Sequence, residues 1–253
     1  ALAWYGKWYA PNNAMLVVAG DVTPAEVKAL AEKYYGPIPR KAVPEARIRP
    51  QEPPALGTRR IEVRDARVRQ PSWSRAWLAP SASRGLPALG PEMSDALDVA
   101  GELLGGGATS RLVRALVHDA ALATSAGVSY DSGALDLSSF WVYASPRPGT
   151  EVAALEAAVE KALADVREQG FSDDEVARAK TRMADAAVFA RDSLQSGARA
   201  IGVAFATGKD VAWVEGWPAR LAAVTTAQVN AALRAVLDPD AHVTAILLPK
   251  PGS

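Results

Sequence analysis

The chain has 253 residues, of which 49% are hydrophobic and 22% are charged, as in an ordinary globular protein. Lysine plus arginine and aspartate plus glutamate both number 28, so no excess of positive charge is available to form a broad face for nucleic acid. The absence of cysteine excludes disulfides, a cysteine nucleophile and iron–sulfur ligation, and the sequence contains no run of eighteen apolar residues that would span a membrane.

Residues 1–43 predict a helix, a strand and a second helix. Residues 1–9 are typical of the end of a helix, and a Pro-Asn-Asn turn follows. The apolar run AMLVVA at residues 14–19 predicts a buried strand. Thr23, with Glu26 three positions later, predicts a capping box at the start of the second helix, which ends at a Gly-Pro pair.

Residues 44–57 contain four prolines and alternating charges. Because proline removes a backbone donor and interrupts helices, this stretch predicts an extended linker. Alternating polarity at residues 58–68 and a tryptophan-containing run at residues 71–79 then predict two strands. The apolar stripe of residues 91–104 predicts a helix that ends in three glycines.

After the glycines, Thr109 or Ser110 is expected to begin a short helix that runs to about residue 120. Residues 122–130 and 135–144 predict a hairpin around an Asp-Ser-Gly turn. The remainder predicts helices at residues 150–169, 172–189, 193–207, 211–224 and 225–237, followed by a strand at 242–248. Ser172, with Glu175 three positions later, predicts a capping box at the start of the second of these helices. The closing helix, turn and strand (AVLDPDAHVTAILLP) repeat the pattern of the opening ones (KWYAPNNAMLVVAG), which suggests two homologous halves.

The loop of Gly105, Gly106 and Gly107 admits three interpretations from its residues: a phosphate cradle, a lining of a substrate cleft, or a plain turn between helices. No Lys-Ser/Thr pair follows the glycines and a helix precedes them, which disfavours phosphate binding. Ser110 and His118 do not predict a catalytic triad, since their spacing is helical and no acid is placed to orient the imidazole.

A zinc site is not expected in this chain, because the two histidines, His118 and His242, lie far apart and no HExxH or HxxEH motif occurs. A zinc hydrolase normally uses three protein ligands. The sequence therefore predicts no catalytic and no metal-binding residue.

With its elements in this order, the chain resembles the C-terminal, non-catalytic half of a pitrilysin/insulinase-type zinc metallopeptidase, of the mitochondrial-processing-peptidase-like bacterial group. The resemblance rests on PNNA followed by a strand and Gly-Asp, on YGPIP after the second helix, on LLGGGATSRLVRAL at residues 103–116 and on SDDEVARAK at 172–180. It covers nearly the whole chain. It implies an α+β fold, an antiparallel or mixed sheet packed by helices, as in one metallopeptidase half (LuxS/processing-peptidase-like).

In such peptidases two homologous halves enclose a peptide chamber, and the first half carries zinc on an HxxEH motif. The resemblance therefore implies that residues 1–43 are the tail of the preceding half, that 44–57 are a linker and that 58–253 are the C-terminal peptidase-like domain. It places zinc in the absent N-terminal half. It also implies a substrate cleft lined by Gly105, Gly106, Gly107, Ser110 and Arg111.

The second half of these peptidases often supplies an arginine and a tyrosine, seven residues apart, that orient the substrate and stabilise the oxyanion. Aligned to that pattern, this chain has Val117 at the arginine position and Thr124 at the tyrosine position. Both are departures, since valine has no donor and the threonine hydroxyl is too short. Either a partner subunit supplies these donors, or the chain belongs to an inactive subunit.

The sequence and the resemblance together predict a non-catalytic half that forms a wall of the peptide chamber and docks the zinc-bearing half or a homologous subunit, as a homodimer or heterodimer. The parent protein is expected to be a zinc metallopeptidase, and this chain alone is expected to be inactive. Its partners would be a peptide or protein substrate, with no nucleic acid and no membrane span. The alternative is a non-proteolytic scaffold of the same fold, as in respiratory-complex core proteins. A periplasmic or otherwise exported bacterial location is expected, with the cytoplasm as the alternative.

Overall fold

A computed structural model describes residues 1–42 and 57–250, so the predicted linker lies outside the described residues except for its last position. The chain divides into two units. The first, here called the N-terminal unit, comprises Ala1–Pro54 and Ala186–Gly216. The second, here called the sheet unit, comprises Ala55–Asp185 and Trp217–Ser253 and contains all the strands of the described residues.

The N-terminal unit is helical. Its elements are α1 (Leu2–Trp8), the 3₁₀ turn η1 (Pro11–Asn13), α2 (Pro24–Tyr34), α7 (Leu194–Ala206) and α8 (Val211–Glu215). The capping box predicted at the start of α2 is confirmed: the Thr23 amide donates to the Glu26 carboxylate at 2.8 Å, and the Glu26 amide donates to the Thr23 hydroxyl at 3.3 Å.

The strand predicted at residues 14–19 is wrong for this structure. The segment has no strand assignment, and Met15, Leu16 and Val18 are each about half exposed. A strand needs a hydrogen-bonded neighbour, and no described strand pairs with this segment. The local sequence has the composition of a buried strand, but burial depends on a partner that the described residues do not supply.

The sheet unit is built on five strands: β1 (Arg59–Asp65), β2 (Ser72–Ala79), β3 (Ala123–Ser129), β4 (Ser138–Pro146) and β5 (Val243–Pro249). Their order is β1-β5-β2-β4-β3, with β1 parallel to β5 and the other neighbours antiparallel. The sequence predicted the first and last residue of each strand to within about three residues. The predicted α+β fold with a mixed, helix-packed sheet is confirmed.

The helical elements of the sheet unit are η2 (Pro91–Met93), α3 (Ser94–Gly105), α4 (Arg111–Val113), the π-helical η3 (Arg114–Asp119), α5 (Val152–Gln169), α6 (Asp173–Ala190), α9 (Trp217–Ala223) and α10 (Thr226–Val236). Helix α6 extends into the N-terminal unit at its end. The single helix predicted at residues 211–224 is divided into α8 and α9 at Gly216. No described helix is long and apolar enough to cross a membrane.

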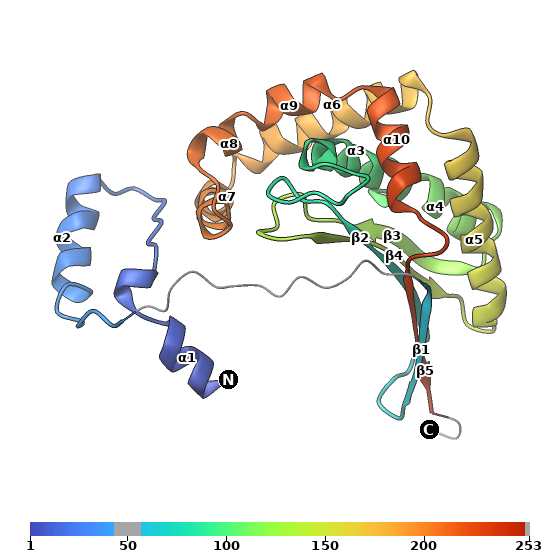
Figure 1. Cartoon of the computed structure of the whole chain (residues 1–253), viewed down its shortest axis with the longest axis horizontal. Helices are drawn as coiled ribbons and strands as arrows, with labels where there is room; N and C mark the ends of the chain where they lie inside the picture. Colours follow the sequence, from blue (N-terminus) through green and yellow to red (C-terminus); the bar gives the residue numbers. More distant parts are fainter. Residues whose placement is uncertain (43–56, 251–253) are drawn as a thin grey trace. The chain divides into compact units, whose positions relative to one another are not determined.

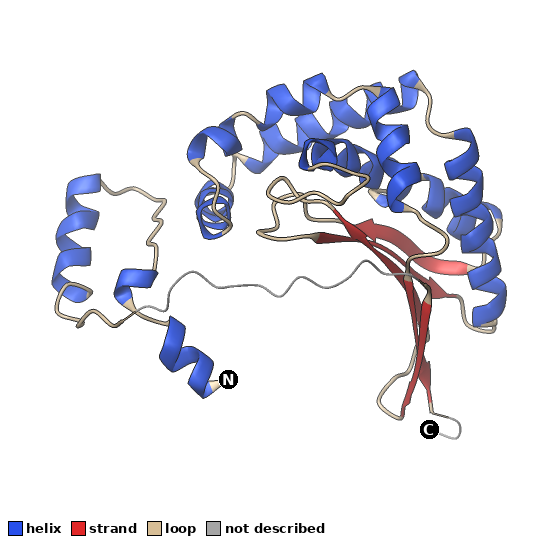
Figure 2. Cartoon of the chain, in the orientation of Figure 1, coloured by secondary structure: helices blue, strands red, loops and turns tan. Residues whose placement is uncertain are grey.

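The helices of the sheet unit lie over one face of its sheet, and the opposite face carries no helix of this unit (Figures 1 and 2). The side chains of β4 alternate accordingly: Phe140 and Val142 are buried under the helices, whereas Trp141 and Tyr143 are 45% and 43% exposed on the other side. We call this second side the open face. Ile61 and Val63 of β1 are also about half exposed.

The covered face holds the hydrophobic core. Its largest fully buried side chains include Trp73 of β2, Phe140 of β4, Leu97 and Leu104 of α3, and Leu233 of α10. Burying one such side chain contributes roughly 1.5–3 kcal/mol. The core therefore fixes helices α3 and α10 against the sheet.

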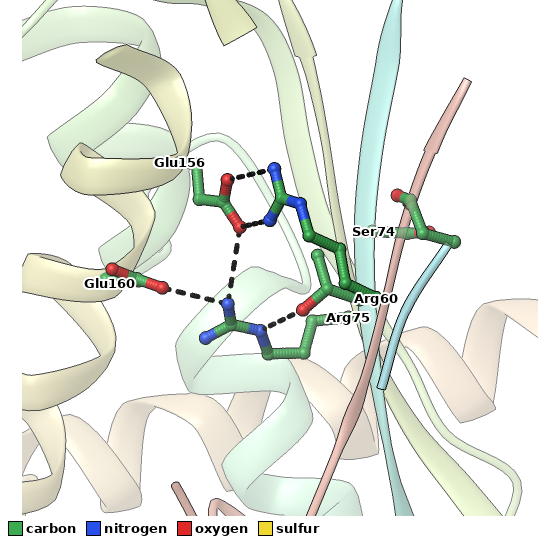
Figure 3. Close-up of polar contacts among 7 residues, drawn as sticks. Arg60, Ser74, Arg75, Glu156 and Glu160 are labelled. Atoms are coloured by element: carbon green, nitrogen blue, oxygen red, sulfur yellow. Dashed lines mark hydrogen bonds and ion pairs between the residues drawn. The ribbon is translucent and has the colours of Figure 1, made fainter. Parts of the chain in front are cut away.

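A buried ion-pair cluster joins α5 to the sheet on the same side (Figure 3). Arg75 of β2 is 9% exposed, donates to the Thr244 hydroxyl at 2.8 Å and contacts Glu160 at 2.9 Å and Glu156 at 3.5 Å. Arg60 of β1 holds the Glu156 carboxylate with two hydrogen bonds of 2.7 and 2.9 Å. One glutamate of α5 thus links two strands that are not adjacent in the sheet.

The protonation of Glu156 reflects this arrangement. Burial alone would raise the pKa of the carboxyl, but the hydrogen bonds from Arg60 and the charges of Arg60 and Arg75 lower it below its usual value. Glu156 therefore stays ionised and compensates the buried guanidinium.

We predict that Glu156→Gln lowers the free energy of unfolding by about 2–3 kcal/mol, since it removes the shared carboxylate while Arg75 stays buried. Urea unfolding measures the change. The control is Glu62→Gln, which removes the partner of an exposed ion pair with Arg64 and is expected to change stability by less than about 1 kcal/mol. Equal effects of the two substitutions would contradict this account.

Candidate functional site

The three glycines at the end of α3 occupy different environments. A Cβ on Gly105 would lie 2.6 Å from the backbone carbon of Gly127 and closer still to the amide of Val128, so the end of α3 lies directly against β3. A Cβ on Gly106 would lie 2.6 Å from the Cα of Glu102. Gly107 has open space at the corresponding position. Two of the glycines thus permit close packing, and the third does not serve that purpose.

The helix expected after the glycines is present, but it changes from an α-helix to a π-helix along its length. It starts as α4 and continues as the π-helical η3, with Leu112 and Leu116 buried. It ends at Asp119, and Ala121, two residues later, has a φ of 52°, in the left-handed region that glycine favours. The wide turn and the left-handed residue together carry the chain into β3.

Two of the predicted cleft residues, Ser110 and Arg111, line a pocket of about 370 Å³. We call this the arginine pocket. Its other lining residues are Leu103, Thr109, Arg114, Glu175, Arg178 and Arg182. The three glycines are not among the lining residues, and Gly106 instead borders a separate pocket with Asp98.

Glu175 holds together two of the helices that line the arginine pocket. Its carboxylate accepts hydrogen bonds from the Ser172 amide at 2.9 Å and hydroxyl at 3.0 Å, which confirms the capping box predicted for α6. The other carboxylate oxygen lies 2.6 Å from Nη2 of Arg111. Burial alone would raise the pKa of Glu175, but the hydrogen bonds from Ser172 and the charge of Arg111 lower it. The start of α6 and the start of α4 are therefore tied by one carboxylate.

The open face of the sheet carries a second hollow, of about 340 Å³, which we call the aromatic groove. It is lined by Ser72, Trp73, Ser74, Ser129, Trp141, Tyr143, Ala144 and Ser145. The Tyr143 ring lies over Gly127, where a Cβ would come within 2.6 Å of the ring carbon that bears the hydroxyl. Sequence reasoning did not identify this groove, although the alternation of β4 already placed two aromatic side chains on one face.

The positions aligned to the arginine–tyrosine pair do not present donors to a common space. The Val117 side chain packs against the core. The Thr124 hydroxyl accepts from Gln70 at 3.2 Å and donates to the Ser145 carbonyl at 3.3 Å, next to an irregularity in the β3–β4 register. Arg147, which sequence reasoning missed, donates to the carbonyls of Val117 and Ala123 at 3.0 and 3.2 Å and so secures the turn between η3 and β3.

The residues do not fit a zinc ion. Among the described residues, no three histidine, cysteine or acidic side chains gather where they could hold a metal. His118 is exposed at the end of η3, and His242 precedes β5, where its ring lies 5.7 Å from that of Trp77. No step that depends on a metal is assigned to these residues.

The profile of a protein family described as the peptidase M16 inactive domain matches residues 1–183. The chain belongs to this family. The arginine pocket and the aromatic groove therefore lie in an M16 inactive domain.

A curated relative, a zinc protease of Streptomyces coelicolor described as uncharacterized, is 30% identical to this M16 inactive domain over 240 residues. The match covers 92% of this chain and 50% of the relative, so the chain spans about half the length of that protein. A protease of Helicobacter pylori shares the fold with a TM-score of 0.84 at 20% identity, over 98% of this chain and 58% of that one.

Two larger structures also share the fold. A periplasmic protease of Escherichia coli matches with a TM-score of 0.65 at 20% identity, over 91% of this chain and 25% of that one. A ferredoxin protease in complex with Arabidopsis ferredoxin matches with a TM-score of 0.64 at 18% identity, over 91% of this chain and 24% of that one. At these identities the likeness establishes the fold of the M16 inactive domain alone.

One carboxyl group of this M16 inactive domain has a pKa close to pH 7. Burial raises the pKa of Asp98, on α3, to about 7, while a hydrogen bond with Ser132 acts in the opposite direction. The neighbouring Tyr130 donates its hydroxyl to the Pro80 carbonyl at 2.7 Å, and its own pKa is raised by burial and by Asp98. Asp98 is therefore a carboxyl group whose protonation changes near physiological pH.

We predict that the stability difference between the wild-type chain and Asp98→Asn depends on pH. Unfolding releases the proton of Asp98 between about pH 4 and pH 7, because the folded carboxyl has a pKa of about 7 against a model value of 3.8. Stability relative to the variant should therefore fall with rising pH, by at most about 1.4 kcal/mol per pH unit, and stay constant above this range. Thermal unfolding across pH measures this. A variant of the exposed Asp185, Asp185→Asn, should follow the wild type, and a pH-independent difference for Asp98→Asn would contradict the prediction.

We also predict that Gly105→Ala and Gly107→Ala differ. The Cβ at residue 105 would collide with the β3 backbone, so this variant should lose about 1–3 kcal/mol of unfolding free energy. At residue 107 nothing lies within 4 Å, and the change should be smaller than about 0.5 kcal/mol or stabilising. Chemical denaturation of both variants is the measurement, and an equal loss in both would show that α3 does not depend on this close approach.

Proposed function

We propose that this chain forms the non-catalytic half of a zinc metalloendopeptidase and contributes one wall of its peptide-binding chamber. The observation that carries the proposal is the open face of the sheet, where exposed Trp141 and Tyr143 border the aromatic groove. A surface of this kind, apolar at its centre and bordered by serine hydroxyls, suits an extended peptide that offers both side chains and backbone groups.

The edge of the sheet supports the same role. Strand β3 ends the strand order and has β4 as its only neighbour among the described strands. Its outer side can therefore accept a peptide strand by β-addition, with backbone hydrogen bonds for affinity and the adjacent groove for side-chain preference. Gly127 and Ser129 connect this edge to the groove, because they pair with Tyr143 and Trp141 in the β3–β4 register.

We further propose that residues 1–43 belong to the preceding homologous half and that residues 58–253 form the C-terminal domain. The segment 14–19 repeats the pattern of β5, which lies between β1 and β2 in its sheet. By analogy, this segment inserts between two strands of the preceding half, which would cover the exposed side chains of Met15, Leu16 and Val18. Docking to the zinc-bearing half is thus part of the function proposed here.

In this proposal the zinc ion and the base that activates water lie in the preceding half, or in a homologous partner subunit, and this chain supplies substrate binding. The substrate class is a peptide or a protein, as for the ferredoxin protease of similar fold. An exported, periplasmic location is part of the proposal, and it is supported by the periplasmic protease of similar fold.

The test uses the whole protein, with its zinc-bearing half, and measures zinc-dependent hydrolysis of a peptide library. The double variant Trp141→Ala/Tyr143→Ala is expected to lower kcat/KM by about tenfold, since it removes roughly 1–2 kcal/mol of apolar contact with the bound peptide. Leu135→Ala is the matched control, because Leu135 is an apolar residue of similar exposure outside the groove and should leave kcat/KM unchanged.

Two results would contradict the proposal. One is the absence of zinc-dependent peptide hydrolysis in the whole protein, alone and mixed with a homologous subunit. The other is an unchanged kcat/KM for the folded double variant, which would show that the open face does not contact the substrate.

A further inference from the structure

The arginine pocket has a composition that neither the packing of the sheet unit nor the proposed peptide chamber requires. Four of its lining residues are arginines and one, Glu175, is acidic, so the lining has a formal excess of three positive charges. Two arginines come from the segment of α4 and η3, and two come from α6. Elements far apart in the sequence thus bring four guanidinium groups to one cavity, and the carboxylates that pair with three of them, Glu102, Asp119 and Asp174, are not among its lining residues.

The arginines differ in how firmly they are held. Arg111 is fixed by the partly buried Glu175, and Arg182 by the partly buried Glu102 at 3.2 Å. Arg114 contacts Asp119 only at 3.8 Å, and both side chains are about 70% exposed. Arg178 pairs with the exposed Asp174 on its own helix. Exposed pairs of this kind contribute roughly 0–1 kcal/mol, so Arg114 and Arg178 can turn to a ligand at little cost.

Guanidinium donors also remain for a ligand. Each guanidinium has five N–H groups. The ion pair of Arg182 uses Nε, that of Arg178 uses Nη1, and Arg111 uses Nε and Nη2. The remaining N–H groups are suited to the paired oxygens of carboxylate or phosphate.

A second, independent observation is the hydroxyl of Ser110. This residue lines the pocket and is only 5% exposed, and its Oγ has no hydrogen-bond partner in the described part of the chain. Serine before a helix usually accepts a hydrogen bond from an amide of the first turn, but Ser110 makes no such bond. An unsatisfied buried hydroxyl costs about 1–3 kcal/mol, and a ligand oxygen would satisfy it.

We propose that the arginine pocket binds a small oxyanion. Arg111 and Arg182 form fixed sides of the site, Arg114 and Arg178 close on the ligand, and the Ser110 hydroxyl donates to one of its oxygens. A volume of about 370 Å³ is sufficient for an inorganic phosphate ion or for an acidic side chain of a peptide. This site is separate from the aromatic groove and does not depend on the proposed role in proteolysis.

The experiment titrates the 253-residue chain by calorimetry with two probes at constant ionic strength. One probe is inorganic phosphate, and the other is the blocked dipeptide acetyl-Asp-Glu-amide. We expect saturable binding of at least one of them, weakened about fivefold or more in Arg114→Gln and Arg178→Gln, because each loses a charged donor. Arg67→Gln is the matched control: it removes an exposed arginine that pairs with Asp65 outside the pocket, and it should bind as the wild type does.

Ser110→Ala provides a further readout that is separate from charge. Without ligand it should unfold at the same or a higher temperature, because a hydroxyl without a partner has been removed, yet it should bind the probe about threefold or more weakly. Thermal unfolding of every variant confirms that the chain remains folded before titration.

The outcomes separate the two sources of the oxyanion. Tighter binding of phosphate identifies a free anion as the ligand, and tighter binding of the dipeptide identifies an acidic segment of a peptide. If neither probe saturates, or if Arg114→Gln and Arg178→Gln bind as tightly as Arg67→Gln, the proposal is wrong. Because none of these measurements involves hydrolysis, a negative result would leave the proposed role in the peptidase untouched.

Discussion

The five-stranded sheet is covered by helices of its own unit on one face, and this asymmetry underlies the rest of the structure. The covered face holds Trp73, Phe140 and the core leucines, and the ion pairs of Arg75 and Glu156 join helix α5 to the strands on that side. A side-chain period of two then places every second residue of the same strands on the open face. The exposed aromatics of β4 are a direct consequence of the burial of their neighbours.

The close approach of the end of α3 to β3 affects both the packing of the sheet unit and the arginine pocket. Gly105 allows the helix to end directly against the backbone of β3. The chain must then turn back within a few residues, and it does so through α4, the wide π turn of η3 and the left-handed Ala121. This path brings Ser110 and Arg111 beside α6, where Glu175 pairs with Arg111. The glycines therefore shape the arginine pocket without lining it.

The comparison with other proteins gives these features a context. The chain belongs to the peptidase M16 inactive-domain family, and it spans about half of a curated zinc protease. Its described residues contain no gathered metal ligands, the Val117 side chain packs against the core, and the Thr124 hydroxyl is bonded to Gln70 and Ser145. Its described part presents an open sheet face, a strand edge at β3 that pairs with no further strand there, and a pocket lined mainly by arginines.

The sequence by itself determined the elements, since capping residues, turns and hydrophobic periodicity act over a few neighbouring residues. It located the five strands, the capping boxes at Thr23 and Ser172, and the glycine turn after α3. It could not determine what depends on distant partners. The segment 14–19 has the composition of a strand, yet strand formation requires a neighbour. The tertiary structure decided the order of the strands, the contact of Arg75 with Glu156 and the gathering of four arginines from α4, η3 and α6. Only the folded chain brings residues so far apart in the sequence into contact.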